Sequence, residues 1–159
     1  MRVGAKLQPQ ALCLLAIWVI TMPLFSCAGT RPANLGIKDG RLSVCPASPN
    51  CVSSDAADDA HGVVPFHIVI SPGEAWRALR TAIGELPRAK IVSSTDDYLH
   101  VECSSAVFGF VDDLELHLRP SENLIAVRSA ARLGYSDFGV NRKRVEQLRS
   151  LLIKQGVLR

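Results

Sequence analysis

Two adjacent carboxylates, Asp112 and Asp113, are the residues of this chain best suited to acid or base chemistry. They lie in a segment, 108–118, whose alternating apolar residues predict a β-strand. Neighbouring strand residues point to opposite faces, so the two carboxylates can act jointly only if a β-bulge re-aims one of them. One hypothesis is therefore a hydrolase-like enzyme that uses Asp112 or Asp113 as acid or base, with His61 or His100 nearby.

Asp112 also interrupts the apolar side of its predicted strand. Strict alternation places it on the same face as Phe108, Phe110 and Leu114. A carboxylate that faces a core must be paired or hydrogen-bonded, or it becomes protonated. We expect it to be held at the start of the last helix, by backbone amides or by a side chain, and so to lock that helix to the sheet. The candidate side chains are Ser129, Asn141 and the arginines within 142–144. Without such a partner, a pocket with a perturbed acid would lie there.

Arginines on the following predicted strand complement these acids. A hairpin turn centred on residues 121–122 places Glu115 opposite Arg128, with Asp113 diagonal to Arg128 and Arg132. Such a ladder of opposite charges on a solvated face would set the register of the two strands.

A second hypothesis is that Arg128, Arg132 and Arg142 form a face that binds an anionic small molecule, a lipid headgroup or a protein partner, because guanidinium groups suit carboxylates and phosphates.

A third chemistry, lipid attachment, is indicated at Cys27. Arg2 and Lys6 form a basic n-region, residues 11–20 are apolar, and the small residue Ser26 precedes the cysteine. This layout resembles a bacterial lipoprotein signal, and the apolar run is shorter than the about 20 residues of a membrane helix. We expect residues 1–26 to be a removed signal peptide and Cys27 to carry palmitate or a similar acyl group. A plain secretory signal is the alternative.

This signal predicts a location in the cell envelope. The chain would be anchored by lipid to a membrane facing the periplasm or exterior, the outer membrane in a Gram-negative cell. Loss of Arg2 and Lys6 leaves sixteen basic against fifteen acidic residues, a formal charge of +1. No basic footprint for nucleic acid remains.

For the cysteines Cys45, Cys51 and Cys103 we expect structural roles, not reactive thiols. Cys45 and Cys51 close a short proline-containing loop, and in an oxidising compartment we expect a disulfide between them. A redox or metal pair is the alternative, although neither CxxC nor a histidine at ligand spacing is present. Cys103 alternates with Leu99 and Val101 and is predicted to be a small core residue. No metal or cofactor motif is present, so we expect neither.

The elements that position these residues predict a single α+β domain. Residues 27–44 read as a tether, and residues 45–156 as a domain that begins with the cysteine loop. Ser71 to Glu74 matches a capping box at the start of a helix that Pro87 ends. The predicted order is β-α-β-β-β-β-α, with an antiparallel sheet of about five strands and two helices packed on one face. The predicted strands are residues 63–70, 91–94, 98–104, 108–118 and 124–131.

Three segments resemble signature blocks of the bacterial and plastid family called domain of unknown function 1499: residues 45–54, 110–115 and 128–142. The resemblance implies no reaction, because that family has none assigned. It does imply that the polar residues of the blocks come together in space. Members often have Ser-Ala-Ser where this chain has Ser129-Ala130-Ala131, so no hydroxyl role is expected there. The implied binding cluster comprises Asn50, Ser53, Ser54, Asp112, Asp113, Arg128, Arg132, Ser136, Asp137, Asn141 and Arg142.

Overall fold

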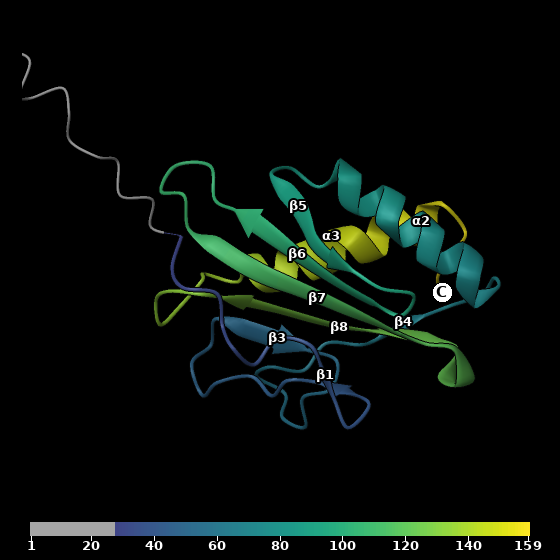
Figure 1. The fold of residues 1–159 in the computed structure, drawn as a ribbon, viewed down its shortest axis with the longest axis horizontal. Helices are drawn as coiled ribbons and strands as arrows, with labels where there is room; N and C mark the ends of the chain where they lie inside the picture. Colours follow the sequence, from purple (N-terminus) through teal and green to yellow (C-terminus); the bar gives the residue numbers. More distant parts are fainter. Residues whose placement is uncertain (1–27) are drawn as a thin grey trace, which may run out of the picture.

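The computed structural model describes residues 28–159, which form the predicted α+β domain (Figure 1). The predicted signal peptide, residues 1–26, and the predicted acylation of Cys27 lie outside the described residues. Two helices and eight strands follow one another along residues 28–159. They are β1 (Ile37–Lys38), β2 (Arg41–Leu42), β3 (Cys51–Ser53), β4 (Phe66–His67), α2 (Pro72–Glu85), β5 (Ala89–Ser94), β6 (Tyr98–Ser104), β7 (Val111–Arg119), β8 (Leu124–Ala131) and α3 (Val140–Lys154), with a short 3-10 turn, η1 (Pro120–Glu122), between β7 and β8.

The main sheet is antiparallel, and its strand order is β3-β8-β7-β6-β5, with β4 also paired to β8. The β7–β8 hairpin has the predicted register, because Glu115 lies opposite Arg128 and Asp112 lies opposite Ala131. Asn123 adopts a left-handed conformation, with φ of 51°, and closes the turn between the strands. The predicted pairing of this hairpin is therefore confirmed.

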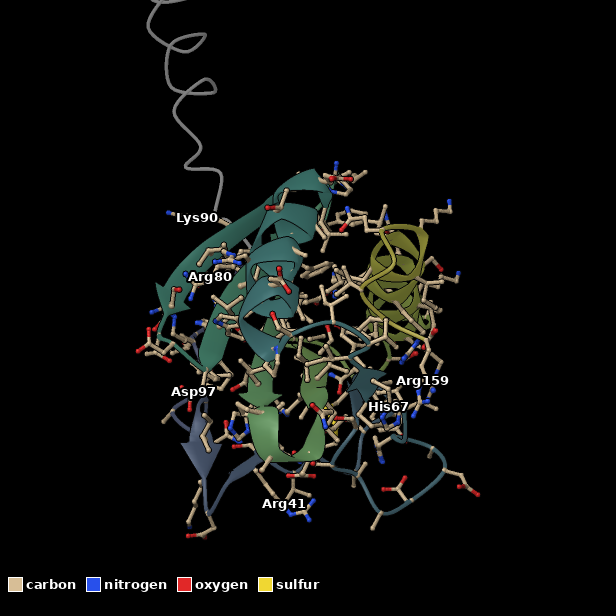
Figure 2. All side chains as sticks on the ribbon, turned by 90° about the vertical axis from the view of Figure 1, so that its right-hand side faces the viewer. Arg41, His67, Arg80, Lys90, Asp97 and Arg159 are labelled. Carbon is tan, nitrogen blue, oxygen red and sulfur yellow. A yellow bond between two sulfur atoms is a disulfide. The ribbon has the colours of Figure 1, made fainter. Side chains whose placement is uncertain are left out.

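Both helices cover the same face of the sheet, as predicted (Figure 1). The side chain of Ser71 caps α2: its Oγ accepts from the backbone N–H of Glu74 and donates to the Glu74 carboxylate. Burial of apolar side chains from both helices against the sheet forms the core, and Figure 2 shows these side chains between helices and strands. The helical contributors include Trp76, Leu79 and Ile83 from α2, and Val145, Leu148 and Leu152 from α3.

The expected tether and loop contain strands that the sequence analysis missed. β1 and β2 pair as a small hairpin, and Leu42 is buried where β2 packs against β7 and β8. β3 pairs with β8, and all three of its residues are buried. Each strand has only two or three residues, too few for an alternating pattern to be recognised. Residues 28–44 are therefore part of the folded domain.

Other predicted boundaries also differ in the structure. Of the strand expected at residues 63–70, only Phe66–His67 pairs as a strand, with an isolated bridge from Ile68 to Leu158. That bridge and the buried Val157 and Leu158 extend the domain beyond residue 156. The strand expected from residue 108 begins at Val111, because Phe108 lies in the exposed loop before it.

The sheet face opposite the helices is covered, not solvated. The β1–β2 hairpin and its flanking segment lie over it, and Arg41 of β2 lies near the β7–β8 turn (Figure 2) and donates to Asp55. As a result Asp113, Glu115 and Arg128 are 1%, 0% and 4% exposed. The charge ladder is therefore a buried layer between the sheet and the N-terminal segment.

Candidate functional site

Asp112 faces the helices, and Arg144 of α3 holds it. The Arg144 guanidinium donates to the Asp112 carboxylate at 2.6 Å and to Oδ1 of Asn141 at 2.6 Å. The hydroxyl of Ser129 on β8 donates to the same Asn141 oxygen at 2.6 Å. No bulge interrupts β7 at Asp112, so the Asp112 side chain points to the face that regular alternation predicts. The expected lock between helix and sheet is confirmed, with Arg144 as the partner.

Most other residues of the third block build the start of α3. Asp137 accepts hydrogen bonds from the backbone N–H groups of Gly139 and Asn141, which α3 cannot satisfy internally. Ser136 accepts from the N–H of Phe138. The fully buried Asn141 donates to the carbonyl of Asn50, at 3.2 Å. These residues connect the disulfide loop, β8 and α3.

A cleft of about 340 Å³ opens beside this lock. The segment after α2, the end of β6 with its following loop, and the first turns of α3 enclose it. Arg88, Lys143 and Arg144 are its cationic side chains, and Asp112 is its only carboxylate. Its apolar wall consists of Leu86, Pro87, Cys103, Ala106 and Val140. The cleft therefore combines excess positive charge with an apolar surface.

The opposite face of the sheet carries the second acidic residue in a buried ionic layer. The Asp113 carboxylate accepts from His100 Nε2 at 2.7 Å and from the Arg132 guanidinium at 2.6 and 2.9 Å. Arg132 also donates to Glu102 at 2.6 Å. Each group of this layer therefore has an oppositely charged or hydrogen-bonding neighbour.

Glu115 extends this layer towards the N-terminal segment. It accepts hydrogen bonds from Arg128 at 2.8 Å, from the Tyr98 hydroxyl at 2.8 Å and from the backbone N–H of Gly36 at 2.7 Å. A hollow of about 290 Å³ reaches Asp113, Arg128 and Arg132 from the side of the disulfide loop. Nε of Arg128 is buried without a partner.

Titration in this layer favours the ionised carboxylates. Burial alone would raise the pKa of Asp113, but hydrogen bonds from Arg132 and His100 outweigh it and hold that pKa below its usual value. The hydrogen bond from Arg132 also lowers the pKa of Glu102. In turn, the hydrogen bond to Asp113 raises the pKa of Arg132. Burial beside Glu115 raises the pKa of Tyr98. The layer is therefore a set of stable charges.

Arg142 does not join Arg128 and Arg132. It donates to the carbonyls of Gly62 at 2.7 Å and Ala60 at 3.0 Å, and so fastens the loop after β3. Ser53 accepts from the N–H of Asp55, and Ser54 accepts from the N–H of Val127. The expected face of three arginines is therefore wrong. The eleven residues divide between the two faces of the sheet and the loop that Arg142 fastens.

Several important residues were missed by sequence reasoning. Asp55 accepts from the backbone N–H of Leu42 and from the Arg119 guanidinium, which fixes the β1–β2 hairpin to the sheet. Burial alone would raise the pKa of Asp55, but the hydrogen bonds from Arg119 and Leu42 and the charges of Arg119 and Arg41 together lower that pKa. Arg88 and Lys143 line the cleft, and neither lies within the three signature blocks. Lys143 directly follows the third block, whereas Arg88 is next to none of them. No local pattern marks either of them.

The cysteines have the predicted arrangement. Cys45 and Cys51 form a disulfide, and Cys103 is a free, buried thiol on β6. Burial raises the pKa of the Cys103 thiol, so it is protonated at neutral pH.

Within residues 28–159, no group of His, Cys, Asp and Glu side chains is arranged to hold a metal ion. No helix in that range is long and apolar enough to cross a membrane.

No curated protein matches this chain. One family model does match, and it is described as "Protein of unknown function (DUF1499)". Its match covers residues 41–152, from the start of β2 into the last turn of α3, and so includes the disulfide, the Asp112 lock and the buried ionic layer. The chain therefore belongs to the DUF1499 family.

Proposed function

We propose that this protein is a lipid-anchored lipoprotein of the cell envelope whose domain is a non-catalytic module that binds an anionic headgroup. The ligand class is a phosphate or carboxylate on a lipid or on a small molecule. The observation that carries this proposal is the cleft beside Asp112, where three cationic side chains and one carboxylate adjoin an apolar wall. The proposed anchor is an acyl group on Cys27, supported by the preceding signal-like segment.

The charges of the cleft suit an anion. Arg88, Lys143 and Arg144 exceed Asp112 by two positive charges. Arg144 is fixed by bonds to Asp112 and Asn141, so a ligand would meet an already ordered guanidinium edge. Lys143 is exposed on α3 and is free to reach a bound anion. Leu86 and Val140 would contact the apolar part of the same ligand.

The hollow beside Arg128 and Arg132 is the weaker candidate for the same function. The arginines near it, including Arg31, are matched in number by Glu102, Asp113 and Glu115. An anion there would have to approach three carboxylates. Of these two hollows, the cleft on the helix side of the sheet therefore carries the excess positive charge.

The enzyme hypothesis has one supporting observation, the 2.7 Å contact between His100 and Asp113. Both groups are at least 95% buried, and the carboxylate already accepts bonds from Arg132. Asp112 lies on the opposite face and is paired with Arg144. Asp113 therefore has no open position from which to take a proton from a substrate, and the two carboxylates cannot act jointly on one substrate from opposite faces of the sheet.

Binding of defined amphiphiles tests the proposed function. The full chain would be produced in a bacterium, extracted in neutral detergent and titrated with lysophosphatidylglycerol, lysophosphatidylcholine and inorganic phosphate. We expect the phosphatidylglycerol form to bind more tightly than the zwitterionic choline form. Binding of phosphate alone would assign the site to a free anion, and equal binding of the two lysolipids would contradict the proposal.

Two lysines of α3 supply a matched pair of variants. Lys143 lines the cleft, whereas Lys154 is exposed in the last turn of the same helix. We expect Lys143→Ala to weaken binding about tenfold, the effect of one lost charge-assisted contact of about 1.5 kcal/mol. Lys154→Ala should bind like the wild type. Equal affinities of the two variants would overturn the assignment to this cleft.

The anchor is tested separately by metabolic labelling. Cells fed an alkyne analogue of palmitate should label the wild-type protein, and Cys27→Ser should abolish the label. Cys103→Ser should retain it, because Cys103 is buried on β6. A labelled Cys27→Ser protein would contradict acylation at Cys27.

A further inference from the structure

The exposed aromatic side chains of residues 28–159 are concentrated in two loops. These loops are residues 105–110, between β6 and β7, and residues 132–139, between β8 and α3. Their large apolar side chains are between 41% and 88% exposed. We call this set the apolar tip: Val107, Phe108, Phe110, Leu133, Tyr135 and Phe138.

The sheet brings both loops to one end of the molecule. Ser104 pairs with Val111 at the base of the first loop, and Asp112 pairs with Ala131 at the base of the second. The backbone N–H of Arg132 donates to the carbonyl of Val111, which joins the two bases directly. Figure 1 shows both loops at the end of the sheet where the described chain begins. The two loops are therefore joined at their bases and lie at the same end of the sheet.

The first described residues lie against this tip. A Cβ atom on Gly29 would be 3.0 Å from Cγ of Leu133 and 3.0 Å from Cβ of Arg132, so the Gly29 backbone packs on the second loop. Cys27 is two residues earlier in the sequence. Two residues span at most about 7 Å, so an acyl group on Cys27 would be attached beside the tip.

The tip carries little free charge. The first loop has no charged residue. In the second loop, Arg132 is paired with Asp113 and Glu102, and Asp137 caps α3. Entry of these loops into a lipid headgroup region would therefore carry one carboxylate, Asp137, which keeps its two hydrogen bonds from backbone N–H groups. Arg88 and Lys143 of the adjoining cleft would instead face anionic headgroups.

We propose that the apolar tip inserts into the headgroup region of the bilayer that holds Cys27. This inference rests on the proposed lipid anchor. Phe and Tyr side chains at a loop end suit the interface between headgroups and acyl chains. Ser105 and Ala106 of the first loop also line the cleft, so the cleft lies at the same end of the domain as the tip. Insertion of the tip would therefore turn the opening of the cleft towards the membrane surface. The membrane itself would then present the anionic headgroup.

Depth-dependent fluorescence quenching tests this insertion. Phe108→Trp and Phe138→Trp place the reporter in the two loops, and Ile153→Trp is the control, because Ile153 is exposed about 20 Å further along α3. Each acylated protein, produced in cells from the full chain, would be reconstituted in vesicles of phosphatidylcholine and phosphatidylglycerol, with or without brominated acyl chains. The wild type, which retains the buried Trp76, supplies the background.

Brominated lipid should cause about a twofold loss of emission for both loop reporters and leave Ile153→Trp unchanged, because interfacial insertion reaches 5–10 Å. Unquenched loop reporters in a palmitate-labelled protein would overturn the insertion while leaving the anchor intact. Unquenched reporters together with dimers in detergent would assign the tip to a second copy instead. Loss of palmitate label from the wild type would contradict the anchor, whatever the quenching.

Discussion

Arg144 and Asp112 lie 2.6 Å apart and join α3 to the central strand β7. The pair neutralises the core-facing Asp112 carboxylate and also connects α3 to the sheet. Arg144 also donates to Asn141, which the Ser129 hydroxyl reaches from β8, so one guanidinium connects the helix to two neighbouring strands. The lock thus positions the cleft that adjoins it.

We expect Arg144→Ala to lower the free energy of unfolding by about 3 kcal/mol, because it leaves the Asp112 carboxylate partly buried without its partner. Urea unfolding at pH 7 measures this change. Arg77→Ala, which removes an arginine from α2, is the control and should change stability by less than about 0.5 kcal/mol. A loss below about 1 kcal/mol for Arg144→Ala would contradict the proposed lock.

Glu115 should be the most sensitive charged residue on the other face. It is 0% exposed and accepts from Arg128, Tyr98 and the Gly36 backbone. Glu115→Ala leaves these donors buried and should cost about 3–5 kcal/mol in urea unfolding. Arg31→Ala disrupts an exposed pair and should cost at most about 1 kcal/mol. Similar losses for the two variants would show that the ionic layer is open to water.

The sequence predicts the β7–β8 register because a short turn and two long alternating strands determine it locally. β3 could not be found in this way. It has three residues, and Cys51 pairs with Ala130, a partner far along the chain. Likewise, alternation identifies the face that carries Asp113 and Glu115 but does not say whether another segment covers it. The covering contact at Gly36 uses a backbone N–H, which leaves no pattern in the sequence.

Helical spacing does not distinguish Arg142 from Arg144 as the partner of Asp112. Successive helix residues are separated by about 100°. Asn141, Val145, Leu148 and Leu152 form the buried stripe of α3, and Arg144 and Arg142 flank it on opposite sides, about 70° and 90° from its centre. The packing of α3 on the sheet determines which flank faces Asp112. The cleft could not be predicted, because Arg88 and Lys143 meet only in the folded chain.

Acid should destabilise the domain through its paired carboxylates. The pKa values of Asp55, Asp113 and Glu102 are lowered in the folded state, so their stabilisation is present above their unfolded values of about 4 and is lost as the pH falls through the folded values. Burial also lowers the pKa of His117, so the loss of stability begins below about pH 6.5.

Urea unfolding at pH 7, 5 and 3 measures this dependence. Asp113→Asn should be less stable at pH 7 and show a shallower decline between pH 5 and pH 3. Asp96→Asn, exposed in the β5–β6 turn, should keep the wild-type slope. A wild-type slope in Asp113→Asn would contradict the contribution of its lowered pKa.

The disulfide between Cys45 and Cys51 should stabilise the domain by about 2 kcal/mol, the value expected for closing so short a loop. Its effect should extend beyond the loop, because Asn50 bonds to Gly134 and receives a bond from Asn141 at the start of α3. We expect Cys45→Ser/Cys51→Ser to lower the thermal midpoint by several degrees. Reductant should lower the wild-type midpoint similarly and leave the double variant unchanged. A reductant effect in the double variant would place the sensitivity elsewhere, while an unchanged midpoint in both experiments would show that the bond contributes nothing to stability.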